Sequence, residues 1–90
     1  MAAYLLVKEK IMKVTVALRG TLKKLFNGPT EKVVEIPEGC TCNDALLAAG
    51  IDYKTTHNFG FVSVNGMRVM IDDEVNEGDY IKAFSRVTGG

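Results

Sequence analysis

Apolar and polar residues alternate regularly near the start of the chain. Every second residue from Met12 to Leu18 is apolar, and the residues between them include Lys13 and Thr15. A period of two is typical of a strand that buries one face. The pattern therefore predicts a first strand at 12–18.

Further stretches also have the composition of strands. Residues 33–36 and 59–64 are rich in apolar side chains, and Asn65-Gly66 after the second of them is the strongest hairpin signal in the chain. Residues 67–71 are therefore expected to return antiparallel to 59–64. A last strand is predicted at 80–84, with Ile81 and Ala83 on one face and the other three side chains, Tyr80, Lys82 and Phe84, on the opposite face.

Two segments have helical patterns. The clearer one is 41–49, where Thr41 and Asp44 have the spacing of a capping box and Gly50 stands where a helix-terminating glycine belongs. A shorter helix is expected at 22–26, capped by Thr21, with Leu22, Leu25 and Phe26 on its buried side. A long hairpin that turns at Asn27-Gly28 is the alternative for that region.

The order of these elements implies an α+β fold, in which a mixed sheet of about five strands is covered by one main helix. The last strand is expected to pair beside the first, in the centre of the sheet. Three parts are expected: an N-terminal extension at 1–11, a single folded domain at 12–84, and a tail at 85–90. Ninety residues leave no room for a second core.

The composition argues against several classes of protein. The formal net charge is zero, with 11 basic and 11 acidic side chains, which argues against a dedicated nucleic-acid binder. No apolar run approaches the length of a membrane span. Two cysteines do not make a disulfide framework, so a cytoplasmic protein with reduced thiols is the default expectation.

The sequence given ends in Val87-Thr88-Gly89-Gly90, directly after the last predicted strand. Glycine has no Cβ, so this backbone fits a slot that is too narrow for other residues. The Gly90 carboxylate is also unshielded by a side chain. These properties suit a terminus that reacts inside another protein, whereas a frayed end or an engineered scar is the unreactive alternative.

Other candidate sites are weaker. Cys40 and Cys42 cannot complete a zinc site by themselves, so no metal is expected. We expect them to be partly buried small residues that flank a helix cap, and a lowered pKa for Cys42, from its position near the helix start, is the alternative. His57 is expected on a surface loop without a catalytic partner. The acidic stretch at 72–79 lacks the spacing of a calcium loop and is interpreted as a solvated turn. Three phenylalanines, Phe59, Phe61 and Phe84, could stack nucleic-acid bases, but we expect them to serve protein docking or core packing instead.

Several segments together resemble the ubiquitin-like sulfur carriers. They are 12–16, Pro37-Glu38-Gly39 with the helix after it, Val64-Asn65-Gly66, 77–84 and the Val-Thr-Gly-Gly ending. The similarity covers about residues 12–90 and implies the β-grasp, ubiquitin-like fold. Within the family, the 22–26 segment and the ending are most similar to the small subunit of molybdopterin synthase, with the thiamine carrier as the competing branch. Ser85 and Arg86 stand where the molybdopterin branch often has prolines, and the extension at 1–11 is a second departure. The possibility of a specialised paralogue that serves another pathway is therefore left open.

The resemblance implies a chemical role for the tail. A ubiquitin-activating-type enzyme joins Gly90 to AMP with ATP and magnesium, and a sulfur-donor enzyme's persulfide displaces AMP to give a thiocarboxylate. In the molybdopterin branch, the tail threads into the large synthase subunit and delivers its sulfur to a pterin precursor. Gly90 is then the reacting residue, Val87, Thr88 and Gly89 thread, and Phe84 and Arg86 help to dock. The chain would hold no permanent cofactor and would not be a catalyst by itself.

Two other functions fit the same features. A ubiquitin-like protein modifier would use the same adenylated Gly90, with a target lysine in place of sulfide. A non-covalent binding module would have the same fold and an inert tail. Isopeptide-linked adducts would favour the first, and function that survives substitution of Gly89 or Gly90 would favour the second.

Overall fold

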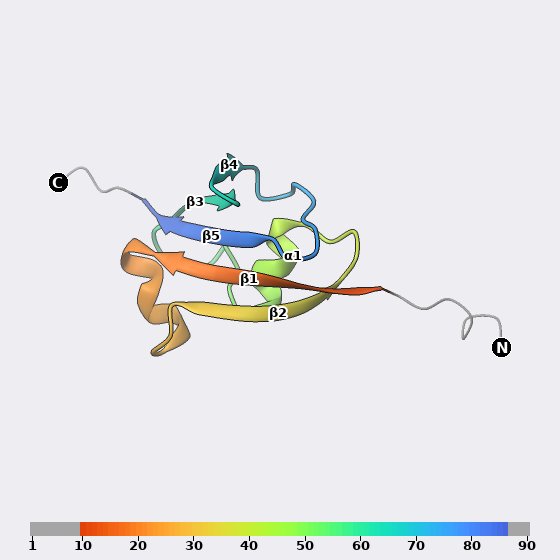
Figure 1. The fold of residues 1–90 in the computed structure, drawn as a ribbon. Coiled ribbons are helices and arrows are strands. Elements are labelled where there is room, and N and C mark those ends of the chain that lie inside the picture. Colours follow the sequence, from red (N-terminus) through yellow and green to blue (C-terminus); the bar gives the residue numbers. More distant parts are fainter. Residues whose placement is uncertain (1–9, 87–90) are drawn as a thin grey trace.

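The computed structural model describes residues 10–86, which form a five-stranded mixed sheet in the order β2-β1-β5-β3-β4 (Figure 1). β1 and β5 are parallel neighbours at the centre, and the other pairs are antiparallel. The predicted position of the last strand beside the first is confirmed. The strands are β1 (Ile11–Arg19), β2 (Glu31–Pro37), β3 (Phe59–Val64), β4 (Met67–Val69) and β5 (Tyr80–Ser85).

The principal helix, α1 (Cys42–Ala48), covers one face of this sheet (Figure 1). Its predicted capping box is confirmed: the Asp44 N–H donates to Thr41 Oγ1 at 3.2 Å, and the Thr41 N–H donates to Asp44 Oδ2 at 2.9 Å. The reciprocal bonds satisfy two backbone donors at the helix start. Gly50, with φ of 93°, takes the predicted left-handed position after the helix.

The core lies between α1 and the covered face of the sheet. Every second residue of β1 faces it, as the alternation predicts, and so do Ile81 and Ala83 of β5. Leu46 of α1 is fully buried against them. The other face of the sheet carries no helix in the described part of the chain, and we call it the open face (Figure 1).

The segment between β1 and β2 differs from its prediction. It is a 3-10 helix, η2 (Gly20–Phe26), which follows Arg19 and has no side-chain cap. Thr21 is therefore not the cap: it lies within the helix, and its side-chain oxygen accepts from Asn58 Nδ2. Leu22 and Phe26 are buried as expected, whereas Leu25 is 49% exposed.

The hairpin between β3 and β4 turns at the predicted residues. Asn65 and Gly66 both have positive φ, 52° and 90°, as a type I′ turn requires. β4 ends at Val69, two residues earlier than expected, because the Met70 N–H turns to Asp73 Oδ2 at 2.9 Å. No helix between residues 10 and 86 is long and apolar enough to cross a membrane.

Candidate functional site

The candidate site is the place where β5 meets the Val87-Thr88-Gly89-Gly90 segment. These four residues, which carry the predicted reaction and threading, lie outside the described residues, as does most of the predicted extension at 1–11. The structure does describe Ser85 and Arg86, which we call the root of the segment. Since β5 lies between β1 and β3, the root leaves the centre of the sheet.

Two hydrogen bonds hold the root to the segments on either side of it, and a third joins those two segments to each other. Ser85 Oγ accepts from the Thr21 N–H at 3.1 Å, and the Arg86 N–H donates to the Asn58 carbonyl at 2.8 Å. Asn58 Nδ2 in turn donates to Thr21 Oγ1 at 3.2 Å, which links the two flanking segments. The direction in which the chain leaves the sheet is therefore set by contacts with η2 and with the loop before β3.

Two glycines allow these contacts. An added Cβ at Gly20 would lie 2.2 Å from Ser85 Oγ, and one at Gly60 would lie 2.9 Å from the Phe84 carbonyl oxygen. Gly20 also has a φ of 67°, whereas Gly60 is needed for space alone. The close approach of β3 to the end of β5 thus depends on the missing side chain at Gly60.

An aromatic pair stands on the open face beside the root. The rings of Phe61 and Phe84 are stacked, with centroids 4.6 Å apart and planes 9° apart. The Arg68 guanidinium lies over the Phe61 ring at 4.5 Å from its centroid. Both phenylalanines are half-buried, so this surface offers an aromatic and cationic patch of the kind that protein interfaces favour.

Phe59 does not join this pair. The strand pairing is irregular between Phe59 and Phe61, and the extra residue, Gly60, reverses the side on which Phe59 lies. Phe59 packs against the core instead, with its ring centroid 6.0 Å from that of Tyr53. A platform of all three phenylalanines is therefore absent from the described structure.

The predicted docking residues lie on different sides of the root. Phe84 belongs to the open-face pair, whereas Arg86 Nε donates to the Phe59 carbonyl at 3.3 Å. Their role in docking stays a prediction. Sequence reasoning missed Thr21 and Asn58, which bond to the root, and Arg68, which lies over Phe61, since all three contacts join residues that are distant from or not periodic with one another along the chain.

Cys42 has no lowered pKa, so the alternative of a reactive thiol is wrong. Burial raises its pKa from an ordinary value of 9.0 to about 11, and the charges of Asp73 and Asp79 add to the increase. The side chain is fully buried at the start of α1, where desolvation disfavours the thiolate more than the short helix favours it. Cys42 is therefore a structural thiol, as the preferred interpretation predicted.

The remaining candidates have structural surroundings. His57 is exposed on the loop before β3, as predicted. The acidic stretch is largely exposed, and two of its carboxylates close turns: Asp79 Oδ2 accepts from the Asn76 N–H, and Asp73 Oδ2 from the Met70 N–H. Within residues 10–86, no group of three or more potential metal ligands is found.

Comparison with known proteins places this architecture in the β-grasp, ubiquitin-like class. No family model matches the chain. Among solved structures, it is similar to the small archaeal modifier protein 1 of H. volcanii, with a TM-score of 0.69 and 20% identity over 84% of this chain and 99% of that chain. It is also similar to a putative molybdopterin converting factor, subunit 1, from Pyrococcus furiosus, with a TM-score of 0.66 and 25% identity over 84% of this chain and 99% of the other.

A third similar structure is Urm1 from Trypanosoma brucei, with a TM-score of 0.54 and 18% identity over 92% of this chain and all of that chain. Together these comparisons confirm the predicted β-grasp fold. At the level of the fold, they also confirm the resemblance to ubiquitin-like sulfur carriers and modifiers.

Proposed function

We propose that this protein is a sulfur carrier whose Gly90 carboxylate becomes a thiocarboxylate for the synthesis of molybdopterin or a related cofactor. The observation that carries the proposal is the position of β5. This central strand ends at a root held from two sides, immediately before Val87-Thr88-Gly89-Gly90. A firmly placed root followed by a segment with two glycines suits a terminus that is presented to a partner.

The proposed chemistry overcomes the poor reactivity of a carboxylate. An activating enzyme transfers AMP from ATP to Gly90 and releases pyrophosphate, which creates a good leaving group. The terminal sulfur of a donor enzyme's persulfide attacks the carbonyl carbon and displaces AMP. A second thiol then cleaves the acyl disulfide, forms a disulfide with the donor sulfur and leaves the thiocarboxylate, a soft nucleophile, on Gly90.

The open face suits the docking of such partners. The open-face patch of Phe61, Phe84 and Arg68 lies next to the root. An enzyme that bound this patch would therefore be placed to bind the segment after Arg86. We propose an adenylating enzyme, a sulfur-donor enzyme and a large synthase subunit as partners. The similarity to a putative molybdopterin converting factor subunit from Pyrococcus furiosus supports the last of these.

The test is the intact mass of the protein purified from its native host. The expected species ends at Gly90 and has one oxygen replaced by sulfur. Deletion of Gly90 should abolish this species and leave the circular dichroism spectrum and the thermal unfolding midpoint unchanged. A Met67→Ser variant, changed at an exposed position remote from the root, is the control and should retain the sulfur. A native chain that continues past Gly90 without processing, or sulfur transfer by the deletion variant, would refute the proposal.

A protein modifier is the second candidate, favoured by the similarity to small archaeal modifier protein 1. The same adenylated Gly90 would be captured by a lysine amine of a target, with release of AMP and formation of an isopeptide bond. Mass spectrometry of tryptic digests from the native host distinguishes the two candidates. Branched peptides that carry a Gly-Gly remnant on lysine indicate modification, whereas a thiocarboxylate without them indicates a dedicated carrier.

A further inference from the structure

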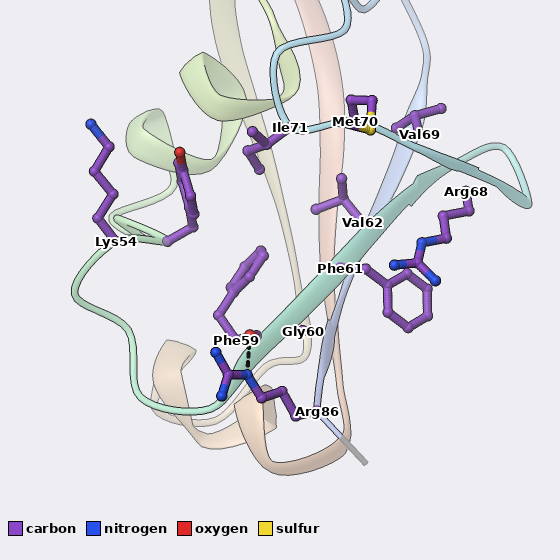
Figure 2. Close-up of a pocket in the computed structure, with 11 residues that line it drawn as sticks. Lys54, Phe59, Gly60, Phe61, Val62, Arg68, Val69, Met70, Ile71 and Arg86 are labelled. Carbon is purple, nitrogen blue, oxygen red and sulfur yellow. Dashed lines mark hydrogen bonds between the residues drawn. The ribbon is translucent and has the colours of Figure 1, made fainter. Parts of the chain in front are cut away.

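A groove of about 440 Å³ lies beside the root, on the side of β3 that faces away from β5 (Figure 2). It is lined by the loop before β3, by residues 59–62 of β3, by residues 68–71 and by Arg86. The groove is large enough for several side chains of a ligand. It is distinct from the Phe61–Phe84 stack, although Phe61 borders both.

The groove exists because β4 is short. β4 pairs only with residues 62–64 of β3, and the chain then turns away at Met70. In the described part of the chain, residues 59–61 therefore have no strand neighbour on this side. An uncovered strand edge is a place where an extended segment of another protein can lie.

All the charged side chains that line the groove are cationic. Lys54, Arg68 and Arg86 approach the groove from three different segments (Figure 2), and no carboxylate of the described residues lines it. The lining also includes the rings of Tyr53 and Phe59 and the side chain of Met70, which is 68% exposed. An apolar floor with a cationic rim complements a segment that carries both acidic and apolar side chains.

We propose that this groove binds an extended acidic segment of a partner protein, with an apolar side chain seated against Met70 and Tyr53. The strand edge, the apolar floor and the absence of lining carboxylates all fit this occupant, whereas a small inorganic anion would use only the charges. This binding is independent of the proposed reaction at Gly90. It does not require adenylation, although Phe61 and Arg68 belong to both the groove and the open-face patch.

The test is a titration of the full, ¹⁵N-labelled chain, followed by amide chemical shifts. The probe is an acetylated, amidated octapeptide that alternates aspartate with valine or leucine. Shifts are expected at Lys54, at 59–62 and at 70–71, with affinity that falls as salt is added. Lys54→Glu and Met70→Ser should each weaken binding about three- to tenfold. The matched controls, Lys24→Glu and Met67→Ser, change exposed residues outside the groove and should bind normally.

Several outcomes would overturn the proposal. One is the absence of shifts in the groove at millimolar peptide, and another is equal binding of a lysine-containing counterpart. Equal shifts from inorganic phosphate would indicate a simple anion site, and shifts that grow with protein concentration alone would indicate self-association. A Gly90 deletion variant should bind the peptide with unchanged affinity. The groove proposal and the proposed function at Gly90 can therefore be refuted independently of each other.

Discussion

The two faces of β5 are built by different means. Ile81 and Ala83 point into the core and are fully buried, whereas Tyr80, Lys82 and Phe84 stand half-buried on the open face. The first pair is held by removal of apolar surface from water. The second group is held by polar and aromatic contacts, such as the Tyr80 hydroxyl donating to Glu31 and the stack of Phe84 on Phe61.

Within this one strand, the core-facing residues contribute mainly to stability and the open-face residues are available for recognition. Full burial of an aliphatic side chain contributes about 1.5–3 kcal/mol, more than a half-exposed aromatic contact. Substitutions on the covered face should therefore lower the free energy of unfolding, and those on the open face should mainly affect binding. Because the strand runs directly into the root, both faces also determine how the terminal segment is presented.

The largest effect is expected for Ile81→Ala. Removal of a fully buried side chain leaves a cavity beside α1 and should lower the free energy of unfolding by about 2–5 kcal/mol. Urea denaturation followed by circular dichroism measures the change. Ile11→Ala, at a β1 residue that is 55% exposed, is the matched control and should cost less than about 0.5 kcal/mol. Equal losses in the two variants would contradict the assignment of the core.

Gly60→Ala should have the next largest effect, because it forces β3 away from the end of β5. The added Cβ meets backbone atoms of Phe84 and Ser85 at 2.9 Å, so the strands must separate at a cost of about 1–3 kcal/mol. Amide hydrogen exchange should quicken at Arg86, whose N–H is bonded to Asn58.

Gly66→Ala provides the comparison for that variant. Its added Cβ has open space around it, and its cost comes from the positive φ of the hairpin turn. It should therefore leave the exchange of Arg86 unchanged. If the two variants loosened Arg86 equally, the close approach at Gly60 would not be what fixes the root.

Phe84→Ser tests the open face. Loss of the stack with Phe61 should cost about 1 kcal/mol of stability and, under the proposed function, lower kcat/KM for adenylation of the chain about tenfold. Pyrophosphate release by the activating enzyme measures the rate. Val33→Ser, at an exposed residue of β2, is the control and should retain the rate. An unchanged rate for Phe84→Ser would place the enzyme's contact elsewhere.

The sequence predicted features whose signals are local. The capping box of Thr41 and Asp44 spans three residues, and the Asn65-Gly66 turn spans two, so both could be recognised without knowledge of the fold. The alternation in β1 and β5 identified the covered face for the same reason. The mixed sheet covered by one helix followed from the order of these elements, whereas the β-grasp topology was implied by the resemblance to the ubiquitin-like sulfur carriers.

The contacts of the root could not be predicted in this way. Thr21 and Ser85 are 64 residues apart in the chain, and Asn58 and Thr21 are 37 apart, so no spacing reveals the bonds between them. The same holds for Gly60, which sequence alone shows only as a glycine within a strand. Thr21 is a residue type that favours helix caps, but the helix begins one residue before it and its side-chain oxygen accepts from Asn58.

The last prediction concerns Cys42, whose pKa is raised in the folded protein. In the unfolded chain the thiol loses its proton near the ordinary value of 9.0, whereas in the folded chain its pKa is about 11. The folded state therefore holds the proton more tightly. This contribution to stability is complete below pH 9 and is lost as the pH rises toward 11. Since lysines and tyrosines titrate in the same window, the difference between the wild type and Cys42→Ala isolates the thiol. The free energies of unfolding of the two proteins should converge as the pH rises from 8 to 10.5. A difference that grew with pH would mean that the folded protein favours the thiolate, and that Cys42 is reactive after all.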